Sequence, residues 1–73
     1  MTTLRARFGK RLRQIRRQKD LTQEQLAEAV GVSVEFLSNI ERGINAPSFE
    51  TLEKLCAVLN VPTHELFLFP EQS

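Results

Sequence analysis

A single glycine divides two short helical patterns in the segment LAEAVGVSVEFLSNIERG, which occupies residues 26–43. Apolar residues recur at helical spacing on both sides of Gly31, so one helix ends there and another starts about three residues later. Glycine adopts the left-handed backbone of a sharp helix end without steric penalty. The methyl group of Ala27 is small enough to let a second helix cross close to the first. The segment therefore predicts two helices that meet at a steep angle.

Capping signals and apolar periodicity predict five helices and no strand, so the fold class is all-α. Four of the five helices begin at good N-cap residues, which are Thr22, Ser33, Ser48 and Thr63. The expected helices span about 3–19, 22–30, 33–42, 48–59 and 63–69. We expect one domain over residues 1–73, because no linker or repeat interrupts the chain.

The spacing around Gly31 is that of a helix-turn-helix. With Gln23 as position one, the small residue is fifth, the glycine is ninth, and apolar residues are fourth, eighth, tenth, fifteenth and eighteenth. The apolar residues are Leu26, Val30, Val32, Leu37 and Ile40. They form a wedge between the two helices and the body, so the helix over 33–42 stands out from the domain. An ordinary pair of core helices is the alternative, and the joint match of seven positions disfavours it.

The outer face of the helix over 33–42 carries side chains suited to reading DNA bases. Its outward residues are Val34, Glu35, Ser38, Asn39 and Arg42. In a major groove, Asn pairs with adenine, Arg with guanine and Glu with cytosine, while a Val methyl contacts thymine. A solvated polar face has a similar composition and is the alternative. Glu35 must accept a hydrogen bond from cytosine to lie there, because phosphates repel a carboxylate, and Phe36 is expected to pack.

Charge is distributed unevenly, although the formal net charge is only +1. Residues 1–19 contain eight basic side chains and no acidic one, whereas residues 20–73 contain two basic and nine acidic side chains. This asymmetry is typical of a chain that binds a polyanion, such as nucleic acid or an anionic surface. A solvated helix face balanced by the acidic remainder fits equally well.

Composition disfavours several other classes of protein. The single cysteine, Cys56, excludes an internal disulfide and a cysteine-based metal site, and we expect a buried thiol. The single histidine, His64, has no nearby nucleophile, and no phosphate-binding glycine loop is present. We therefore expect no enzyme activity, cofactor, metal or small-molecule ligand. The chain has no signal peptide and no apolar run of membrane-spanning length, so we expect a cytoplasmic protein with no membrane partner.

These residues resemble the Cro/repressor-type, or Xre-like, helix-turn-helix transcription regulators. The resemblance covers about residues 8–67 and is carried by FGKRLRQIR, LTQEQLAEAVGVS, LSNIERG, APSFETLEKLCAVLNVP and ELF. It implies a compact five-helix repressor-like domain that binds double-stranded DNA through the major groove. The small size and the end of the chain shortly after the fifth helix are also similar to the controller proteins of restriction–modification systems.

The resemblance also implies roles for single residues. The base-reading positions of the family correspond to Val34, Glu35, Ser38 and Asn39. Gln23 is implied to hold a phosphate, together with the N-terminus of its helix. Arg16 and Glu41 are implied to form a partly buried ion pair between the helices over 3–19 and 33–42, and each lies at the edge of an apolar face.

The loop GINAPS departs from the family, in which Lys or Arg often grips phosphate at these positions. Asn45, Ser48 and the free N–H groups at the start of the helix over 48–59 can still serve as donors. The full set of residues expected at phosphates is Thr22, Gln23, Arg42, Asn45, Ser48 and Arg11.

The C-terminal sequence ELFLFP contains four consecutive apolar residues at 66–69. A short helix buries about two of them, which leaves Leu68 and Phe69 near the surface with Val58. Because exposed apolar patches commonly mark interfaces, we expect a homodimer through these three residues, and completion of the core is the alternative. Such a dimer sets two recognition helices about 34 Å apart on a near-palindromic operator.

A sequence-specific transcription regulator is the favoured function. The alternative is a protein-interaction module of the same fold, of the antitoxin or co-activator type, which needs the apolar patch but no base-reading face. The combination of Gln23, Ser38 and Asn39 favours DNA.

Overall fold

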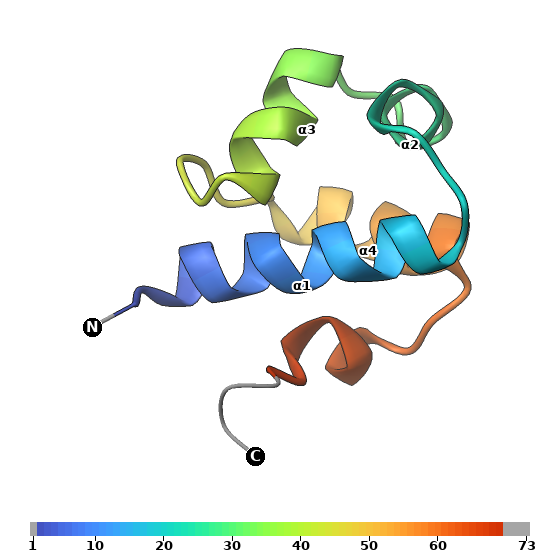
Figure 1. Ribbon diagram of the computed structural model, residues 1–73. Coiled ribbons are helices and arrows are strands. Elements are labelled where there is room, and N and C mark those ends of the chain that lie inside the picture. Colours follow the sequence, from blue (N-terminus) through green and yellow to red (C-terminus); the bar gives the residue numbers. More distant parts are fainter. Residues whose placement is uncertain (1, 70–73) are drawn as a thin grey trace.

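The computed structural model describes residues 2–69, which form helices and contain no strand. The elements are α1 (Leu4–Gln18), α2 (Gln23–Val30), α3 (Val34–Glu41), α4 (Phe49–Leu59) and a short 3-10 helix, η1 (Thr63–Phe67). Figure 1 shows α2 and α3 on one side of α1 and η1 on the opposite side. The predicted all-α fold is confirmed. Within the described residues, no helix combines the length and apolar character needed to cross a membrane.

Side-chain caps determine where the four α-helices begin. The capping residues Thr3, Thr22, Ser33 and Ser48 each accept a hydrogen bond from the backbone N–H three residues later. At α2 the Gln25 side chain also accepts from the Thr22 backbone N–H, which completes a capping box.

The fifth element differs from the expected helix in kind and length. It is a 3-10 helix that ends at Phe67, whereas an α-helix to residue 69 was expected. Pro62, and not Thr63, occupies the N-cap position, and no side chain caps this end. A segment of five residues without a cap gains little from α-helical bonds, so it adopts the tighter geometry that short segments use.

One apolar core joins all five elements. The fully buried large side chains come from α1 (Leu12), α2 (Leu26), α3 (Leu37, Ile40), α4 (Leu55, Leu59) and η1 (Leu66). Because α3 contributes two of them, its inward face is fixed against the body and its opposite face is left outside.

Gly9 allows α1 and α3 to touch at the level of their backbones. A Cβ atom at this position would collide with the carbonyl oxygen of Ile40 and would lie 2.6 Å from that of Glu41. Backbone atoms of a packed helix cannot move aside as a flexible side chain can. The close crossing of α1 and α3 therefore requires a glycine at this position of α1. The crossing in turn fixes where α3 lies relative to α1.

Gly31 produces the turn between α2 and α3. Its φ of +88° is left-handed, and its backbone N–H donates to the Ala27 carbonyl over 2.9 Å. The N–H of Val32 donates to the same carbonyl over 3.0 Å, so the turn closes on a single residue of α2. The break in the helical pattern is thus a Schellman-type end that redirects the chain into α3.

Candidate nucleic-acid interface

The α3 helix has one buried face and one open face. Leu37 and Ile40 are fully buried, while Val34 and Glu35 are exposed. Ser38 and Asn39 are half-buried at the edge of the open face. Phe36 is half-buried and packs against the core, as expected. Among residues 2–69, the side chains of Glu35, Ser38 and Asn39 have no hydrogen-bond or ion-pair partner, so their polar groups are available to a ligand.

The loop after α3 is anchored to the C-terminal half of that helix. The backbone N–H groups of Ile44 and Asn45 donate to the Asn39 carbonyl over 2.9 and 3.2 Å. Asn45 is half-buried, and Arg42, the C-cap of α3, is exposed. The loop therefore holds two predicted phosphate contacts beside the open face of α3.

Two residues of the predicted phosphate set already use their hydroxyl oxygens within the protein. Thr22 Oγ1 accepts from the Gln25 N–H over 3.0 Å, and Ser48 Oγ accepts from the Thr51 N–H over 3.1 Å. Both residues are exposed and stand at the first turn of a helix. What they present toward an anion is the positive end of α2 and of α4.

A buried ion pair fastens α1 to the end of α3. Arg16 Nε lies 2.6 Å from Glu41 Oε2, and Arg16 Nη2 lies 3.1 Å from Glu41 Oε1. Arg16 Nη1 also donates to the Leu21 carbonyl over 2.7 Å, and both charged residues are 7% exposed. The bidentate geometry satisfies both charges inside the protein and gives the pair a structural role.

Gln23 extends this network to the start of α2. Its Nε2 donates to Glu41 Oε1 over 3.0 Å, and the residue is half-buried. A side-chain amide carries two N–H donors, so one donor remains after this bond. The sequence indicated Gln23 and Glu41 separately, but it did not indicate that they touch.

Arg11 lies away from the open face of α3, which corrects its assignment to the phosphate set. Its Nε donates to the Glu65 carbonyl over 2.9 Å, and its Nη2 lies 3.1 Å from the Glu65 carboxylate. Glu65 belongs to η1, on the side of α1 opposite to α3 (Figure 1). The guanidinium is thus used to attach η1 to α1.

One residue of the predicted dimer patch is also corrected, because Phe69 is buried. It is 8% exposed, its ring lies edge-on to Phe67 at 6.2 Å between centroids, and the Arg7 guanidinium lies 5.1 Å from its ring centroid. Val58 is half-buried against the core, and Leu68 remains 51% exposed. Phe69 therefore packs against Phe67 and Arg7 of its own chain, and the dimer contact stays a prediction. The thiol of Cys56 is half-buried, where a buried one was expected.

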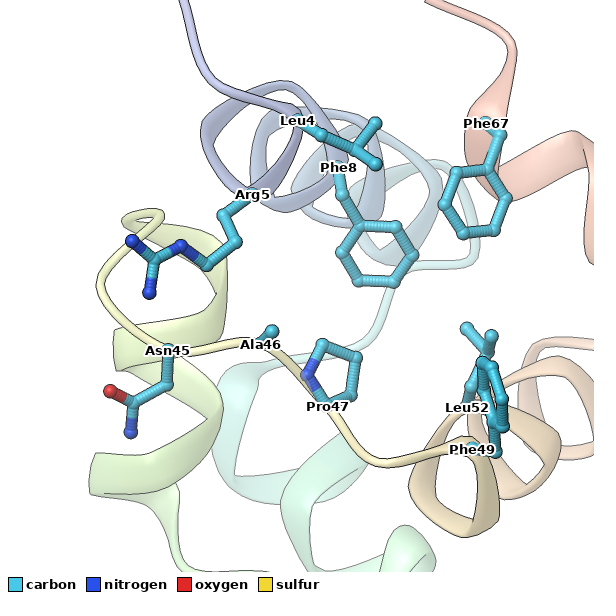
Figure 2. Close-up of a pocket in the computed structure, with 9 residues that line it drawn as sticks. All are labelled: Leu4, Arg5, Phe8, Asn45, Ala46, Pro47, Phe49, Leu52 and Phe67. Carbon is cyan, nitrogen blue, oxygen red and sulfur yellow. The ribbon is translucent and has the colours of Figure 1, made fainter.

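An apolar groove on the described surface was missed by sequence analysis. It has a volume of about 170 Å³ and lies between the start of α1, the α3–α4 loop, the start of α4 and η1 (Figure 2). Phe49, on its rim, is 84% exposed. Helical spacing conceals this feature, because Phe49 stands three residues before Leu52 and so falls on the inward side of the expected helix.

Comparisons with known proteins agree on one family. The helix-turn-helix family model matches residues 12–66. The regulator SinR of Bacillus subtilis strain 168 is 44% identical over 60 residues, which cover 81% of this chain and 54% of SinR. The chain thus spans about half the length of the SinR relatives it matches.

Two solved structures are similar over most of the chain. The restriction–modification controller protein C.AhdI from Aeromonas hydrophila superimposes with a TM-score of 0.82 at 37% identity, covering 85% of this chain and 94% of C.AhdI. SinR, solved in complex with DNA, superimposes with a TM-score of 0.77 at 43% identity, covering 82% of this chain and 97% of that one.

Proposed function

This chain belongs to the helix-turn-helix family of Cro/repressor-type, Xre-like transcription regulators, and from that premise we propose that it recognises an operator in double-stranded DNA as a homodimer. The carrying observation is the open face of α3, whose polar groups have no partner within residues 2–69 while Leu37 and Ile40 anchor the other face. A helix held in this way presents hydrogen-bonding groups to the major groove without first breaking contacts of its own. The relatives are regulators, which points to a non-enzymatic DNA-binding protein.

Base recognition is assigned to four residues of the open face, which are Val34, Glu35, Ser38 and Asn39. The amide of Asn39 suits bidentate pairing with adenine, and the Val34 methyl groups suit a thymine methyl. Ser38 pairs with several bases, so it contributes less to discrimination. Glu35 requires a cytosine donor, because a carboxylate beside phosphates is otherwise repelled.

Phosphate binding is assigned to groups on both sides of α3. Gln23 offers its remaining N–H donor at the start of α2, where the helix dipole also attracts an anion. Arg42 and Asn45 offer a charge and an amide on the other side. Thr22 and Ser48 mark helix ends whose backbone N–H groups complete the clamp.

The size of α3 supports recognition by two copies. A helix of eight residues is about 12 Å long, and base pairs are spaced by about 3.4 Å, so one copy reads about four base pairs. Two copies related by a two-fold axis read two half-sites about 34 Å apart, which gives a near-palindromic operator. A cytoplasmic location is part of the same proposal.

The test is a selection of bound duplexes from a random library, followed by titration of selected and random DNA. We expect wild-type protein to prefer selected DNA by at least about 10³-fold. Asn39→Ala should weaken binding to selected DNA by roughly 5- to 150-fold and leave binding to random DNA unchanged. The matched control is Gln18→Ala, which removes an exposed amide from the end of α1. Equal affinity for both DNAs, with no effect of Asn39→Ala, contradicts the proposal.

A protein-interaction module of the same fold is the second candidate, and the apolar groove beside Phe49 is the observation that favours it. The same titration separates the two functions. A module that binds protein alone shows no preference among DNA sequences.

A further inference from the structure

We propose that the second copy of this chain docks on the apolar groove, with each copy inserting its Phe49 ring into the groove of the other. The groove is lined by Leu4, Phe8, Pro47, Phe49, Leu52 and Phe67, together with polar residues at its rim, and we call it the Phe49 groove. The inference rests on the proposed function, because an operator with two half-sites requires two copies. It places the dimer contact on a surface other than Val58, Leu68 and Phe69.

Several exposed apolar side chains lie together around the Phe49 groove. Phe49 is 84% exposed, Leu4 is 55% exposed and Phe67 is 36% exposed. Single exposed apolar residues are common on proteins, but several around one hollow mark an interaction surface. An aromatic side chain buries about 150–250 Å² when fully covered, so two Phe49 rings contribute a large share of a small interface.

The volume of the hollow suits one aromatic ring. An apolar cavity of about 150 Å³ is known to accommodate benzene, and the Phe49 groove measures about 170 Å³. Figure 2 shows Phe8, Phe67, Pro47 and Leu52 facing a common space. Phe49 stands on the rim and leaves this space open, so a ring from outside is needed to fill it.

A surface that carries both a projecting ring and a matching hollow is self-complementary. A two-fold dimer requires this property, because the same patch must meet itself and each contact occurs twice. A partner of another sequence needs only the hollow and gives no reason for the exposed Phe49. The pairing of ring and hollow therefore selects a second copy as the occupant.

Charges around the groove agree with this choice. Arg5 lines the groove and donates from Nη1 to the Ile44 carbonyl over 3.3 Å, with no carboxylate partner in the described part of the chain. Glu50 and Glu53 are exposed on α4 beside Phe49, and no ion pair occupies them among residues 2–69. Glu50 directly follows Phe49, and Arg5 lines the groove that receives the Phe49 ring, so insertion of the ring is expected to bring the Glu50 carboxylate toward the Arg5 of the second copy. Because the dimer has a two-fold axis, this pair of Arg5 with Glu50 occurs twice, and the opposite charges attract each other at both places.

The position of the groove is also compatible with DNA binding. One wall is the α3–α4 loop, which includes Asn45 of the proposed phosphate clamp. The dimer contact therefore adjoins the DNA-binding face. This arrangement lets dimerisation and operator binding reinforce each other.

The first test is the mass of free protein measured by sedimentation over a wide range of micromolar concentrations. Wild-type protein should approach twice the chain mass of 8.4 kDa as concentration rises. Phe49→Lys should dimerise at least about tenfold more weakly, because it puts a charge into an apolar hollow. Leu68→Lys is the matched control, since Leu68 is also exposed but does not line the groove, and it should behave as wild type. Unaltered circular dichroism shows that each variant is folded.

The second test uses reversed charges to identify the occupant as another copy. Arg5→Glu and Glu50→Arg should each weaken dimerisation, and the variant that combines them should regain it. A wild-type chain that stays monomeric and binds one copy per operator overturns the inference. The inference is also overturned if Leu68→Lys dissociates the dimer and Phe49→Lys does not. That result would place the dimer contact at the C-terminal patch of Val58, Leu68 and Phe69.

Failure of the interface and failure of the function give different results. Phe49→Lys leaves the open face of α3 intact, so it should keep its preference for an isolated half-site over random DNA. If that preference remains while Phe49→Lys and wild type bind the full operator equally well, the interface is wrong and the function stands. If wild-type protein has no sequence preference, the function itself is wrong.

Discussion

Gln23 Nε2 donates to Glu41 Oε1 over 3.0 Å, so the start of α2 is fastened to the buried ion pair that joins α1 to α3. Three helices thus meet at one carboxylate. The residue that the proposal places against a phosphate is held by the same group that fixes the end of the recognition helix. The same network therefore contributes to the stability of the fold and to the orientation of Gln23 for DNA binding. Substitutions at different members of the network can measure the two contributions separately.

Glu41→Gln should destabilise the fold by about 3–5 kcal/mol, because it leaves Arg16 buried without its counter-charge. This is a large share of the stability of a domain of this size. Chemical denaturation with a far-UV signal measures the loss. Glu28→Gln, on the exposed side of α2, is the control and should change stability by less than about 0.5 kcal/mol.

Replacing both members of the pair should recover much of that stability. The double variant Arg16→Met, Glu41→Leu removes both buried charges and keeps similar volume, and such replacements are often neutral or stabilising. A double variant as unstable as Glu41→Gln contradicts this account of the pair. Its DNA affinity should still be reduced, because Gln23 has then lost the acceptor that orients it.

Gln23→Ala should lower affinity for selected and random duplexes by the same factor. A phosphate contact carries no sequence information, and a hydrogen bond to a charged group is worth about 1.5–3 kcal/mol, or roughly 10- to 150-fold. Titration of both duplexes by fluorescence anisotropy measures the two factors. A loss confined to the selected duplex contradicts the phosphate assignment and makes Gln23 a base-reading residue.

Much of the fold follows from local sequence. Gly31 and Ala27 determine the turn between α2 and α3, and the capping residues determine where helices begin, because each of these effects involves neighbours within five residues. The separation of α3 into a buried and an open face follows from helical period alone. The chemistry of its open face could therefore be predicted from the residue types at the outward positions.

The differences arise where distant segments meet. Arg11 contacts Glu65, which is 54 residues away, so nothing beside Arg11 in the sequence shows that its charge is used. Phe69 is buried while Leu68 stays exposed as expected, because the chain leaves η1 after Phe67 in an extended conformation, and in extended backbone neighbouring side chains point to opposite sides. The expected α-helix to residue 69 would not turn Phe69 and Leu68 to opposite sides, so the burial of Phe69 could not be predicted from it.

Gly9→Ala should destabilise the fold by about 1–3 kcal/mol, although alanine is the better helix former by about 1 kcal/mol. The added Cβ meets the backbone carbonyls of Ile40 and Glu41, and relief requires α1 and α3 to move apart. Thermal denaturation compares this variant with Arg13→Ala, an exposed change in the same helix. If the Gly9→Ala protein is more stable than wild type, the higher helix propensity of alanine outweighs the cost of moving α1 and α3 apart, which contradicts this account.

The salt dependence of DNA binding tests the role of the α3–α4 loop. The loop between Arg42 and Ser48 contains no Lys or Arg, so few counterions are released there when DNA binds. Asn45→Lys adds one cation beside the proposed phosphate contact, and the plot of log affinity against log salt should become steeper by about 0.9. Affinity should rise at low salt for selected and random DNA alike, because the added contact is to the backbone. Lys54→Ala, an exposed change on α4, is the control and should leave the slope as in wild type. An unchanged slope for Asn45→Lys would mean that this loop stays clear of the phosphates, and the clamp would then consist of Arg42 and the N-terminus of α2.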